Sequence, residues 1–275
     1  MSSSHFDEIA AVYDESLPAH VVEHYLRKRT AFAVRICHGG RVLDVGCGTG
    51  ALAARLADRG YEVVGIDPSQ GMLDVMRTRH PEIKAVQADG TALPFDTASF
   101  DLVLTVAALH HVAEPAAIRQ TLAEMTRVCR PQGRILVWDH NPENPYWSSL
   151  MARVPQDTGE ERLVPQQEIV EGLSAAGARV LSVQQLGLVP DFTPPRAIRA
   201  AAALERAFER TPYFRRYGAH NVIVATKPPG RDSSGAPSAH ARVDAHQRGL
   251  DAGDAVQRGQ TVGGGEPGRD RVDRP

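Results

Sequence analysis

A candidate binding site for a small charged molecule lies in residues 42–50, Val-Leu-Asp-Val-Gly-Cys-Gly-Thr-Gly. The apolar run that contains Asp44 is typical of a buried strand, and it ends in Gly46, Gly48 and Gly50 before a helix-forming stretch. Glycine lets the backbone turn sharply and lets a ligand approach without meeting a Cβ atom. A strand, a glycine turn and the start of a helix predict a nucleotide-type pocket at the carboxyl end of the strand.

The glycine spacing fits two classes of cofactor. Gly46-x-Gly48-x-x-Ala51 also matches the loose dinucleotide fingerprint, in which alanine takes the third place. Asp44 argues against that class, because a carboxylate two residues before the first glycine would repel a pyrophosphate. The same carboxylate suits a cationic amino-acid group, and S-adenosylmethionine carries an α-ammonium and no phosphate. The loop alone leaves both classes open.

Two later carboxylates suit the nucleoside part of such a ligand. Asp67 ends the next apolar run, about 20 residues after Gly46, where an acidic residue accepts hydrogen bonds from ribose hydroxyls in both cofactor classes. Asp89 follows a third run and could accept from an adenine exocyclic amine, while the apolar residues 93–95 cover the ring. These positions predict an adenosine-type ligand without choosing its class.

Three histidines are candidate catalytic groups. His110 and His111 follow the strand expected at 100–106, and His140 follows the strand expected at 135–138. A histidine at a strand end can act as a general base, or it can hold a loop through its ring nitrogens. His140 is the leading candidate base, because it is expected on the rim of the pocket. We expect no metal site, since no spacing typical of zinc ligands occurs.

Hydrophobic periodicity predicts strands and helices in alternation. Strands are expected at about 41–46, 61–67, 83–88, 100–106, 135–138, 180–188 and 221–226, and helices at about 5–17, 20–37, 51–59, 69–80, 115–129, 166–176 and 194–208. This alternation is typical of an α/β protein in which helices cover both faces of a parallel sheet. In such doubly wound sheets the ligand lies at the carboxyl ends of the strands.

The ordered set of motifs resembles the type 11 class I S-adenosylmethionine-dependent methyltransferases, in the branch that includes the ubiquinone and menaquinone C-methyltransferases. The matching pieces are Phe6-Asp7 with Tyr13-Asp14, Val42–Gly50, Val64–Ser69, Ala88–Gly90 with Leu93–Phe95, Phe100–Val103 with Leu109–Val112, and Arg127–Arg134. They cover about residues 5 to 140. Gln132 stands where this family more often has glycine.

The resemblance implies a Rossmann-like, doubly wound α/β fold with a mostly parallel seven-stranded sheet and an antiparallel last strand. It implies S-adenosyl-L-methionine as the cofactor. Asp44 and the glycine loop would lie near the methionine part, Asp67 at the ribose, and Met72 with Asp89 and Gly90 at the adenine. The full set of expected cofactor contacts is Tyr13, Asp44, Gly46, Cys47, Gly48, Gly50, Asp67, Pro68, Met72, Asp89, Gly90 and Thr105.

One methyltransferase domain is expected over residues 1–228, with N-terminal helices at 1–40, a cofactor-binding core at 41–140 and substrate-side elements at 141–228. Residues 229–275 have hardly any large apolar side chain and are expected to be a disordered tail. The net charge of −2 gives no reason to expect binding to nucleic acid or to a membrane surface. With three cysteines, no signal segment and no spanning run, we expect a soluble cytoplasmic protein without stable membrane insertion.

The acceptor is expected to be a small or lipophilic molecule. Six aromatic residues after the fifth strand could line its cavity or form a lid: Tyr146, Trp147, Phe192, Phe208, Tyr213 and Phe214. Two other functions stay open. A catalytically silent protein that only binds S-adenosylmethionine would keep the same cofactor motifs. An NAD(P)-dependent oxidoreductase would share the glycine turn and Asp67, but it would not explain Asp44 or Asp89.

Overall fold

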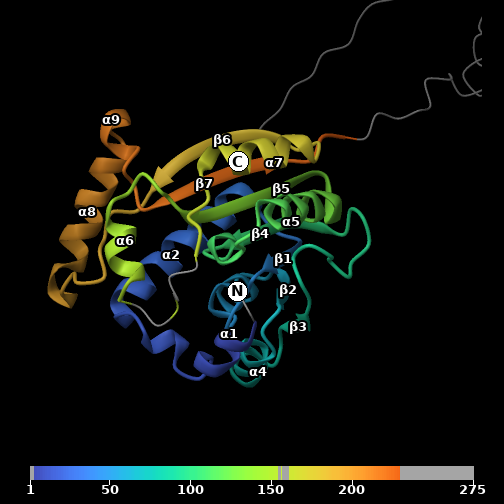
Figure 1. Ribbon diagram of the computed structural model, residues 1–275, viewed down its shortest axis with the longest axis horizontal. Helices are drawn as coiled ribbons and strands as arrows, with labels where there is room; N and C mark the ends of the chain where they lie inside the picture. Colours follow the sequence, from blue (N-terminus) through green and yellow to red (C-terminus); the bar gives the residue numbers. More distant parts are fainter. Residues whose placement is uncertain (1–2, 154–155, 157–160, 230–275) are drawn as a thin grey trace, which may run out of the picture. The chain divides into compact units, whose positions relative to one another are not determined.

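A seven-stranded sheet organises the computed structural model, which describes residues 3–153, 156 and 161–229 (Figure 1). The strand order is β3-β2-β1-β4-β5-β7-β6. Strands β1 to β5 pair in parallel, and β7 runs antiparallel to both β5 and β6. The strands are β1 (Arg41–Val45), β2 (Glu62–Asp67), β3 (Lys84–Gln87), β4 (Phe100–Val106), β5 (Cys129–His140), β6 (Arg179–Leu186) and β7 (His220–Thr226). The predicted doubly wound sheet with an antiparallel last strand is confirmed.

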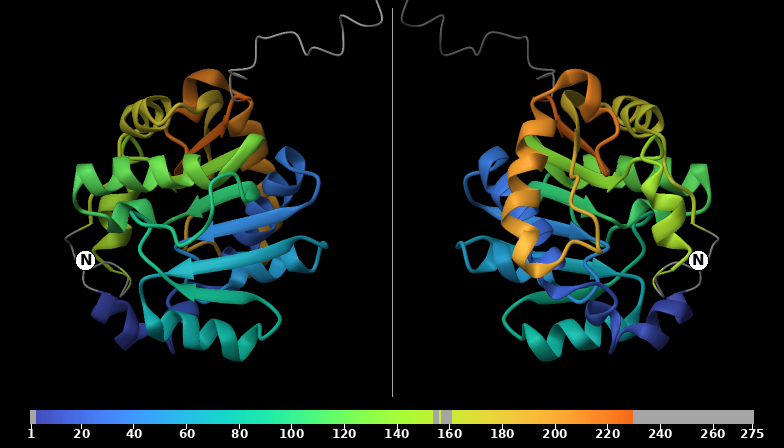
Figure 2. Two further views of the ribbon diagram at one scale, coloured as in Figure 1. Left: turned by 90° about the vertical axis from the view of Figure 1, so that its right-hand side faces the viewer. Right: turned by 90° about the vertical axis from the view of Figure 1, so that its left-hand side faces the viewer.

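Helices cover both faces of this sheet (Figure 2). They are α1 (Ser3–Ile9), α2 (Ala19–Ile36), α3 (Ala51–Ala57), α4 (Gln70–Arg79), α5 (Pro115–Val128), α6 (Tyr146–Met151), α7 (Gln166–Ala175), α8 (Ile198–Glu209) and α9 (Pro212–Arg215). Buried side chains of α5 and α7 pack on one face, and those of α2, α3 and α4 pack on the other. Because successive residues of a strand point to opposite faces, one apolar strand supplies both cores.

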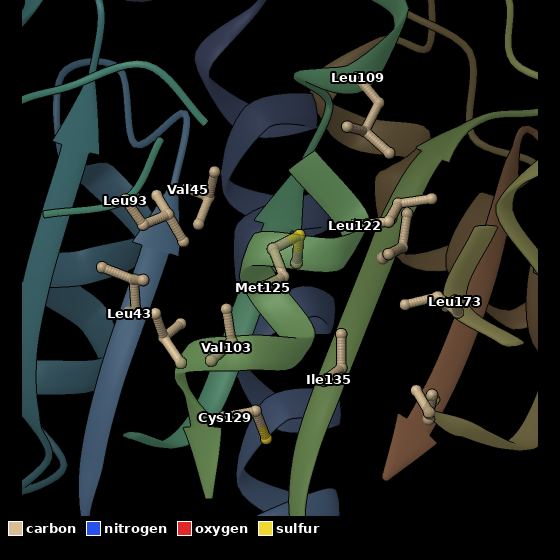
Figure 3. Packing of buried hydrophobic residues seen from close by; sticks show 14 of the residues in the cluster. Leu43, Val45, Leu93, Val103, Leu109, Leu122, Met125, Cys129, Ile135 and Leu173 are labelled. Carbon is tan, nitrogen blue, oxygen red and sulfur yellow. The ribbon is translucent and has the colours of Figure 1, made fainter. Parts of the chain in front are cut away.

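The core under α5 shows how the sheet is anchored (Figure 3). Leu122 and Met125 of α5 belong to the same buried cluster as Leu43 of β1, Val103 of β4 and Ile135 of β5. These side chains are almost fully shielded from solvent. Burying a side chain of this size contributes about 1.5 to 3 kcal/mol. The central strands are therefore fixed in place beneath the loops that follow their carboxyl ends.

Two local predictions were wrong, and two short helices were missed. The helix expected at 5–17 is two pieces, α1 and a 3-10 turn at Tyr13–Glu15, because Asp7 and Asp14 bond outward to other elements. The strand expected at 135–138 begins earlier, at Cys129, and its register with β4 shifts near Phe100. The short helices α6 and α9 were not predicted, since four to six residues are too few to show a period.

No helix in the described part of the chain is long and apolar enough to cross a bilayer. The expected tail at 229–275 lies outside the described residues from residue 230 onward.

Candidate functional site

Two adjoining cavities open where the parallel strands end. The first cavity, about 470 Å³, lies over the ends of β1, β2 and β4. The second cavity, about 580 Å³, extends from the glycine loop to α2, α6 and the residues before α8. Tyr13, Gly46, Gly48, Ala107 and His111 line both. A ligand in one cavity would therefore meet a ligand in the other across the glycine loop.

All predicted site residues except Gly50 line one or both of these cavities. The first is lined by Tyr13, Gly46, Gly48, Asp67, Pro68, Met72, Asp89, Gly90, Thr105 and His111. The second is lined by Tyr13, Asp44, Gly46, Cys47, Gly48, His110, His111 and His140. Gly50 lines neither cavity. It is the residue before α3, and its φ of 84° forms part of the turn from the loop into the helix.

The glycine loop needs its glycines at the cavity wall. Gly46 has a φ of 75°, and a Cβ atom there would lie 2.6 Å from the Cβ of Ala108. The amides of Gly46 and Cys47 both donate to the carbonyl of Ile66, each at 2.9 Å. These bonds hold the turn of β1 against β2. Burial, followed by the nearby Asp44 and Asp67, holds the pKa of the Cys47 thiol well above the ordinary value, so the thiol stays neutral.

Asp67 is held with its carboxylate in the first cavity. The amide of Gly48 donates to Oδ2 and the amide of Ser69 donates to Oδ1, both at 2.9 Å. Burial raises the pKa of this carboxyl, while the two amides lower it. A carboxylate oriented by backbone amides is suited to accept hydrogen bonds from a diol, as a ribose would offer.

The remaining wall of the first cavity fits a flat, partly polar ring. Met72 is buried, and a Cβ atom at Gly90 would lie in tight contact with Thr121, at 3.0 Å from its Cγ2. Thr105 Oγ1 is buried without a hydrogen-bond partner among the described residues, so the cavity offers an unused polar atom. The Asp89 carboxylate accepts from the amide and the hydroxyl of Thr91 at 2.7 and 2.6 Å, at the exposed edge of the cavity.

Asp44 is a buried carboxylate that faces the second cavity at the glycine loop. Burial and the nearby Asp67 raise its pKa to about 7, and Arg29 opposes this shift. The carboxyl is therefore half protonated near neutral pH. A cationic group beside it would favour the charged form.

Arg29 of α2 also lines the second cavity, and the sequence did not point to it. Its Nε is buried without a hydrogen-bond partner in the described part of the chain, and burial lowers the pKa of the guanidinium. Arg29 lies on a helix far from the motifs along the chain, so only the packing of α2 beside β1 places it here. The cavity thus holds an anionic and a cationic group near the same loop.

His110 and Asp139 form a buried pair at the carboxyl ends of β4 and β5. His110 Nδ1 donates to Asp139 Oδ1 at 2.6 Å, and the His110 amide donates to Oδ2 at 3.1 Å. Asp139 was not among the predicted catalytic or cofactor-binding residues. The sequence feature that could have indicated it is the expected pairing of the strands that end before His110 and at Asp139. This pairing brings two residues 29 positions apart into contact. With Nδ1 bound to a carboxylate, Nε2 is the basic nitrogen of the neutral ring.

His140 lies in an aromatic stack beside this pair. Its ring centroid is 4.0 Å from that of His110 and 3.5 Å from that of Trp147. Burial and the neighbouring histidines hold its pKa well below the ordinary value, so the ring is neutral. His110, Asp139 and His140 bring potential metal ligands within 4.8 Å of one another. The two imidazole rings lie against each other at an interplanar angle of 31°, and the Asp139 carboxylate accepts hydrogen bonds from His110 and from the His140 amide.

Four of the six predicted aromatic residues line the second cavity: Tyr146, Trp147, Phe192 and Phe208. Tyr213 and Phe214 are 68% and 53% exposed and line neither cavity, so for these two residues only the expectation of a lid stays a prediction. The other walls are mainly aliphatic and come from residues 17–26 and 188–190. The second cavity is thus largely apolar. Its polar lining residues are Arg29, Asp44, the histidines, and also Asp14, Ser16, Thr49, Asn144, Gln156 and Asp191.

Comparison with known proteins supports a single family. Residues 42–133 match the model of a methyltransferase domain. The chain is 40% identical over 140 residues to a demethylmenaquinone methyltransferase of Renibacterium salmoninarum, an alignment covering 48% of this chain and 58% of that protein. It is 44% identical over 108 residues to an uncharacterized methyltransferase of Mycobacterium tuberculosis, covering 39% of this chain and 43% of that protein. The chain thus spans less than two thirds of these relatives.

Solved structures share the fold at lower identity. A possible histamine N-methyltransferase from Thermotoga maritima has a TM-score of 0.59 at 21% identity, covering 82% of this chain and 98% of that one. Geranyl diphosphate C-methyltransferase from Streptomyces coelicolor, solved with S-adenosyl-L-homocysteine, has a TM-score of 0.54 at 18% identity, covering 73% of this chain and 79% of that one. Residues 42–133 are thus similar to a methyltransferase domain, and the chain is similar to demethylmenaquinone methyltransferases over about half of its length.

Proposed function

We propose that this protein transfers a methyl group from S-adenosylmethionine to a small, largely apolar acceptor bound in the second cavity. The observation that carries this proposal is the pair of adjoining cavities, one suited to a nucleoside and one largely apolar, which meet at the glycine loop. A catalytically silent cofactor binder has no need of the second cavity. An NAD(P)-dependent oxidoreductase would place a pyrophosphate beside the buried Asp44.

The described residues fit the parts of the proposed cofactor. Asp67 would accept from the ribose hydroxyls, Met72 would pack on the adenine, and Asp89 with Gly90 would border its edge. Asp44 would accept from the α-ammonium, and Arg29, which lines the same cavity, would receive the carboxylate together with Tyr13. When bound, the cofactor supplies an electrophilic methyl group on a sulfonium. The chain would contribute orientation and the exclusion of water.

The second cavity supports an aromatic acceptor that carries a hydroxyl group. Its walls combine aliphatic side chains with Tyr146 and Trp147, and its polar end holds the His110–Asp139 pair. We propose that His110 Nε2 takes the proton of the acceptor hydroxyl and that Asp139 stabilises the resulting imidazolium. A reduced quinone meets these requirements, in keeping with the name of the demethylmenaquinone methyltransferase relative. His140, stacked on Trp147, would then form the wall beside the ring.

Calorimetric titration tests the cofactor assignment. Wild-type protein is expected to bind S-adenosylhomocysteine and not NADH. Asp67→Ala should weaken binding at least about a hundredfold, because it removes two charge-assisted hydrogen bonds of roughly 1.5 to 3 kcal/mol each. Asp58→Ala, an exposed carboxylate at the end of α3, is the matched control. Unchanged affinity in Asp67→Ala would overturn the ribose assignment.

Incubation with methyl-labelled S-adenosylmethionine and reduced naphthoquinones tests the activity. Label in the extracted quinone is the expected result. If the cofactor binds and no label reaches the quinone, the quinol acceptor is wrong. If cell-extract fractions of small molecules and lipids also stay unlabelled, the silent binding protein is the better account.

A further inference from the structure

The stretch from residue 192 to 217 carries a concentration of exposed positive charge. Arg196, Arg199, Arg206, Arg210, Arg215 and Arg216 are all exposed. None of these six forms an ion pair with a carboxylate in the described part of the chain. Arg199, Arg206 and Arg210 recur at intervals of seven and four, so they follow one flank of α8.

The acidic residues of the same stretch face inward. Glu205 is 1% exposed and is held by Lys28, His24 and the amide of Leu188. Glu209 accepts from Lys28 and from the amide of Gly187. Both carboxylates thus bind groups of α2 and of the segment after β6. The outer surface of α8 and α9 is therefore uniformly basic, although the whole chain has a net charge of −2.

Large apolar side chains stand among these arginines. Phe192, Leu204, Tyr213, Phe214 and Tyr217 are 71, 64, 68, 53 and 36% exposed. A single exposed apolar residue is ordinary, but five within one basic stretch are not. Arginine mixed with aromatic and leucine side chains suits the boundary between lipid headgroups and acyl chains, where each side chain finds its preferred medium.

This surface continues into the second cavity. Phe192 and Tyr217 line the cavity as well as the surface, and Phe208 on the inner side of α8 lines the cavity too. Phe192 also contacts Tyr146 of α6, with ring centroids 6.1 Å apart. Helices α8 and α9 form the outer edge of the described fold beside α6 (Figures 1 and 2). The apolar cavity thus has its mouth at the basic and aromatic surface.

We infer that residues 192–217 form a docking surface that holds the protein peripherally on an anionic lipid bilayer. The arginines would attract the headgroups, and the exposed aromatic residues would enter the interface without spanning it. An acidic protein or a nucleic acid would also attract the arginines, but it would leave the exposed Phe and Leu side chains unused. Entry of an apolar acceptor from the bilayer rests on the proposed function; the docking itself does not.

Vesicle co-sedimentation tests the inference. The full chain is expected to bind phosphatidylglycerol-containing vesicles, to bind pure phosphatidylcholine vesicles weakly, and to lose affinity as salt rises. Each arginine near an anionic surface contributes roughly a fivefold gain in binding. The triple variant Arg199→Gln, Arg206→Gln, Arg210→Gln should therefore bind about a hundredfold more weakly. The control Arg59→Gln, Arg119→Gln, Arg179→Gln removes the same charge from exposed positions elsewhere.

A second variant separates lipid from other polyanions. Tyr213→Ser with Phe214→Ser keeps every arginine and alters neither cavity, so it should weaken vesicle binding while leaving S-adenosylhomocysteine affinity and melting temperature unchanged. The proposal would be overturned if the Arg199/Arg206/Arg210 variant and the Arg59/Arg119/Arg179 control lost vesicle affinity equally. It would also be overturned if vesicle binding did not depend on the phosphatidylglycerol content. Binding to RNA or an acidic protein with no binding to vesicles would overturn it as well. Because cofactor affinity is measured in parallel, failure of docking is distinct from failure of the methyltransferase proposal.

Discussion

Asp44 works against the stability of the ligand-free fold. Its carboxylate is buried at the end of β1, near Asp67, and its pKa is raised to about 7. An acid whose pKa is higher in the folded state than the unfolded value of about 3.9 stabilises the fold only at low pH, and that stability is lost as the pH rises toward 7. A buried carboxyl with a raised pKa is typical of a functional site, where a bound ligand can neutralise its charge.

The pH dependence of cofactor binding follows from this pKa. Below pH 7 Asp44 must lose a proton before it can accept from an ammonium, so affinity for S-adenosylhomocysteine should fall by up to about tenfold per pH unit below 7 and level off above it. Calorimetry from pH 5.5 to 8.5 measures the trend. Asp44→Asn should bind weakly and show little of this dependence.

The same substitution gives an independent check on the free protein. At pH 8 Asp44→Asn should raise the free energy of unfolding by about 1 to 3 kcal/mol, because the buried charge is gone. At pH 4 the difference should shrink. A variant that is destabilised at pH 8 in urea unfolding would contradict the assigned burial cost.

A further prediction concerns His110 and Asp139. His110→Ala should lower kcat by about 10² to 10⁴-fold, as is typical when a general base is lost, with unchanged S-adenosylhomocysteine affinity. Asp139→Asn should lower kcat less and alter its pH profile, since the ring would lose its orientation. His38→Ala, outside both cavities, is the control. A large loss of kcat in His140→Ala with none in His110→Ala would assign the base to His140 instead.

The sequence indicated residues within motifs better than residues brought in by packing. Asp44, Asp67 and the glycines lie at strand ends, so their place in the cavities follows from the strand pattern. Asp139 meets its partner His110 because β5 pairs with β4, and Arg29 reaches the cavity because α2 packs beside β1. The sequence around each residue does not show these contacts. Gln132 adopts a φ of 65°, which shows that a turn suited to glycine can be kept by neighbouring strands.

At the scale of elements, the N-terminal segment closes the cavities. Asp7 Oδ1 accepts from Ser69 Oγ at 2.7 Å and from the Gly71 amide at 2.8 Å, which ties α1 to the start of α4. Asp14 accepts from Thr49 Oγ1 at 2.9 Å and pairs with Arg79. These bonds place Phe6 and Tyr13 in the cavity walls. The amphipathic spacing of residues 5–17 predicted one helix, because a local pattern contains no information on hydrogen bonds to residues far along the chain.

Loosening this segment should speed release of the cofactor. Asp14→Ala removes the bond to Thr49 and the pair with Arg79, so the dissociation rate of S-adenosylhomocysteine should rise by about tenfold, the effect of one or two hydrogen bonds of roughly 1 kcal/mol. Stopped-flow displacement measures the rate. Glu15→Ala, next to it and exposed, should leave the rate unchanged. Equal rates in wild type and Asp14→Ala would mean that the segment does not retain the ligand.

At the scale of the whole molecule, alternating periodicity predicted the sheet and its helical layers. The strand order was beyond that pattern, because β7 is inserted between β5 and β6, which precede it in the chain. Burial on both faces explains the continuous apolar run of β7. The docking surface was also not predicted. The net charge of the whole chain sums the arginines of α8 with carboxylates elsewhere, so it does not show a local basic surface.

The insertion of β7 predicts which part of the chain is needed to fold. All seven residues of β7 are buried, and they pair with both β5 and β6. Residues 230–275 contain one leucine, four valines and no aromatic residue, too little apolar surface for a core. A chain ending at Pro229 should therefore keep its melting temperature within about 2 °C, a change equivalent to less than about 1 kcal/mol.

The same truncated chain should bind S-adenosylhomocysteine as tightly as the full chain, because both cavities are built from residues before 221. A chain ending at Ala219 is the contrasting variant. It lacks β7, leaves β6 without a partner and exposes the edge of β5, so it should fail to unfold cooperatively in thermal denaturation. A large drop in stability on removing only residues 230–275 would show that this segment packs on the domain.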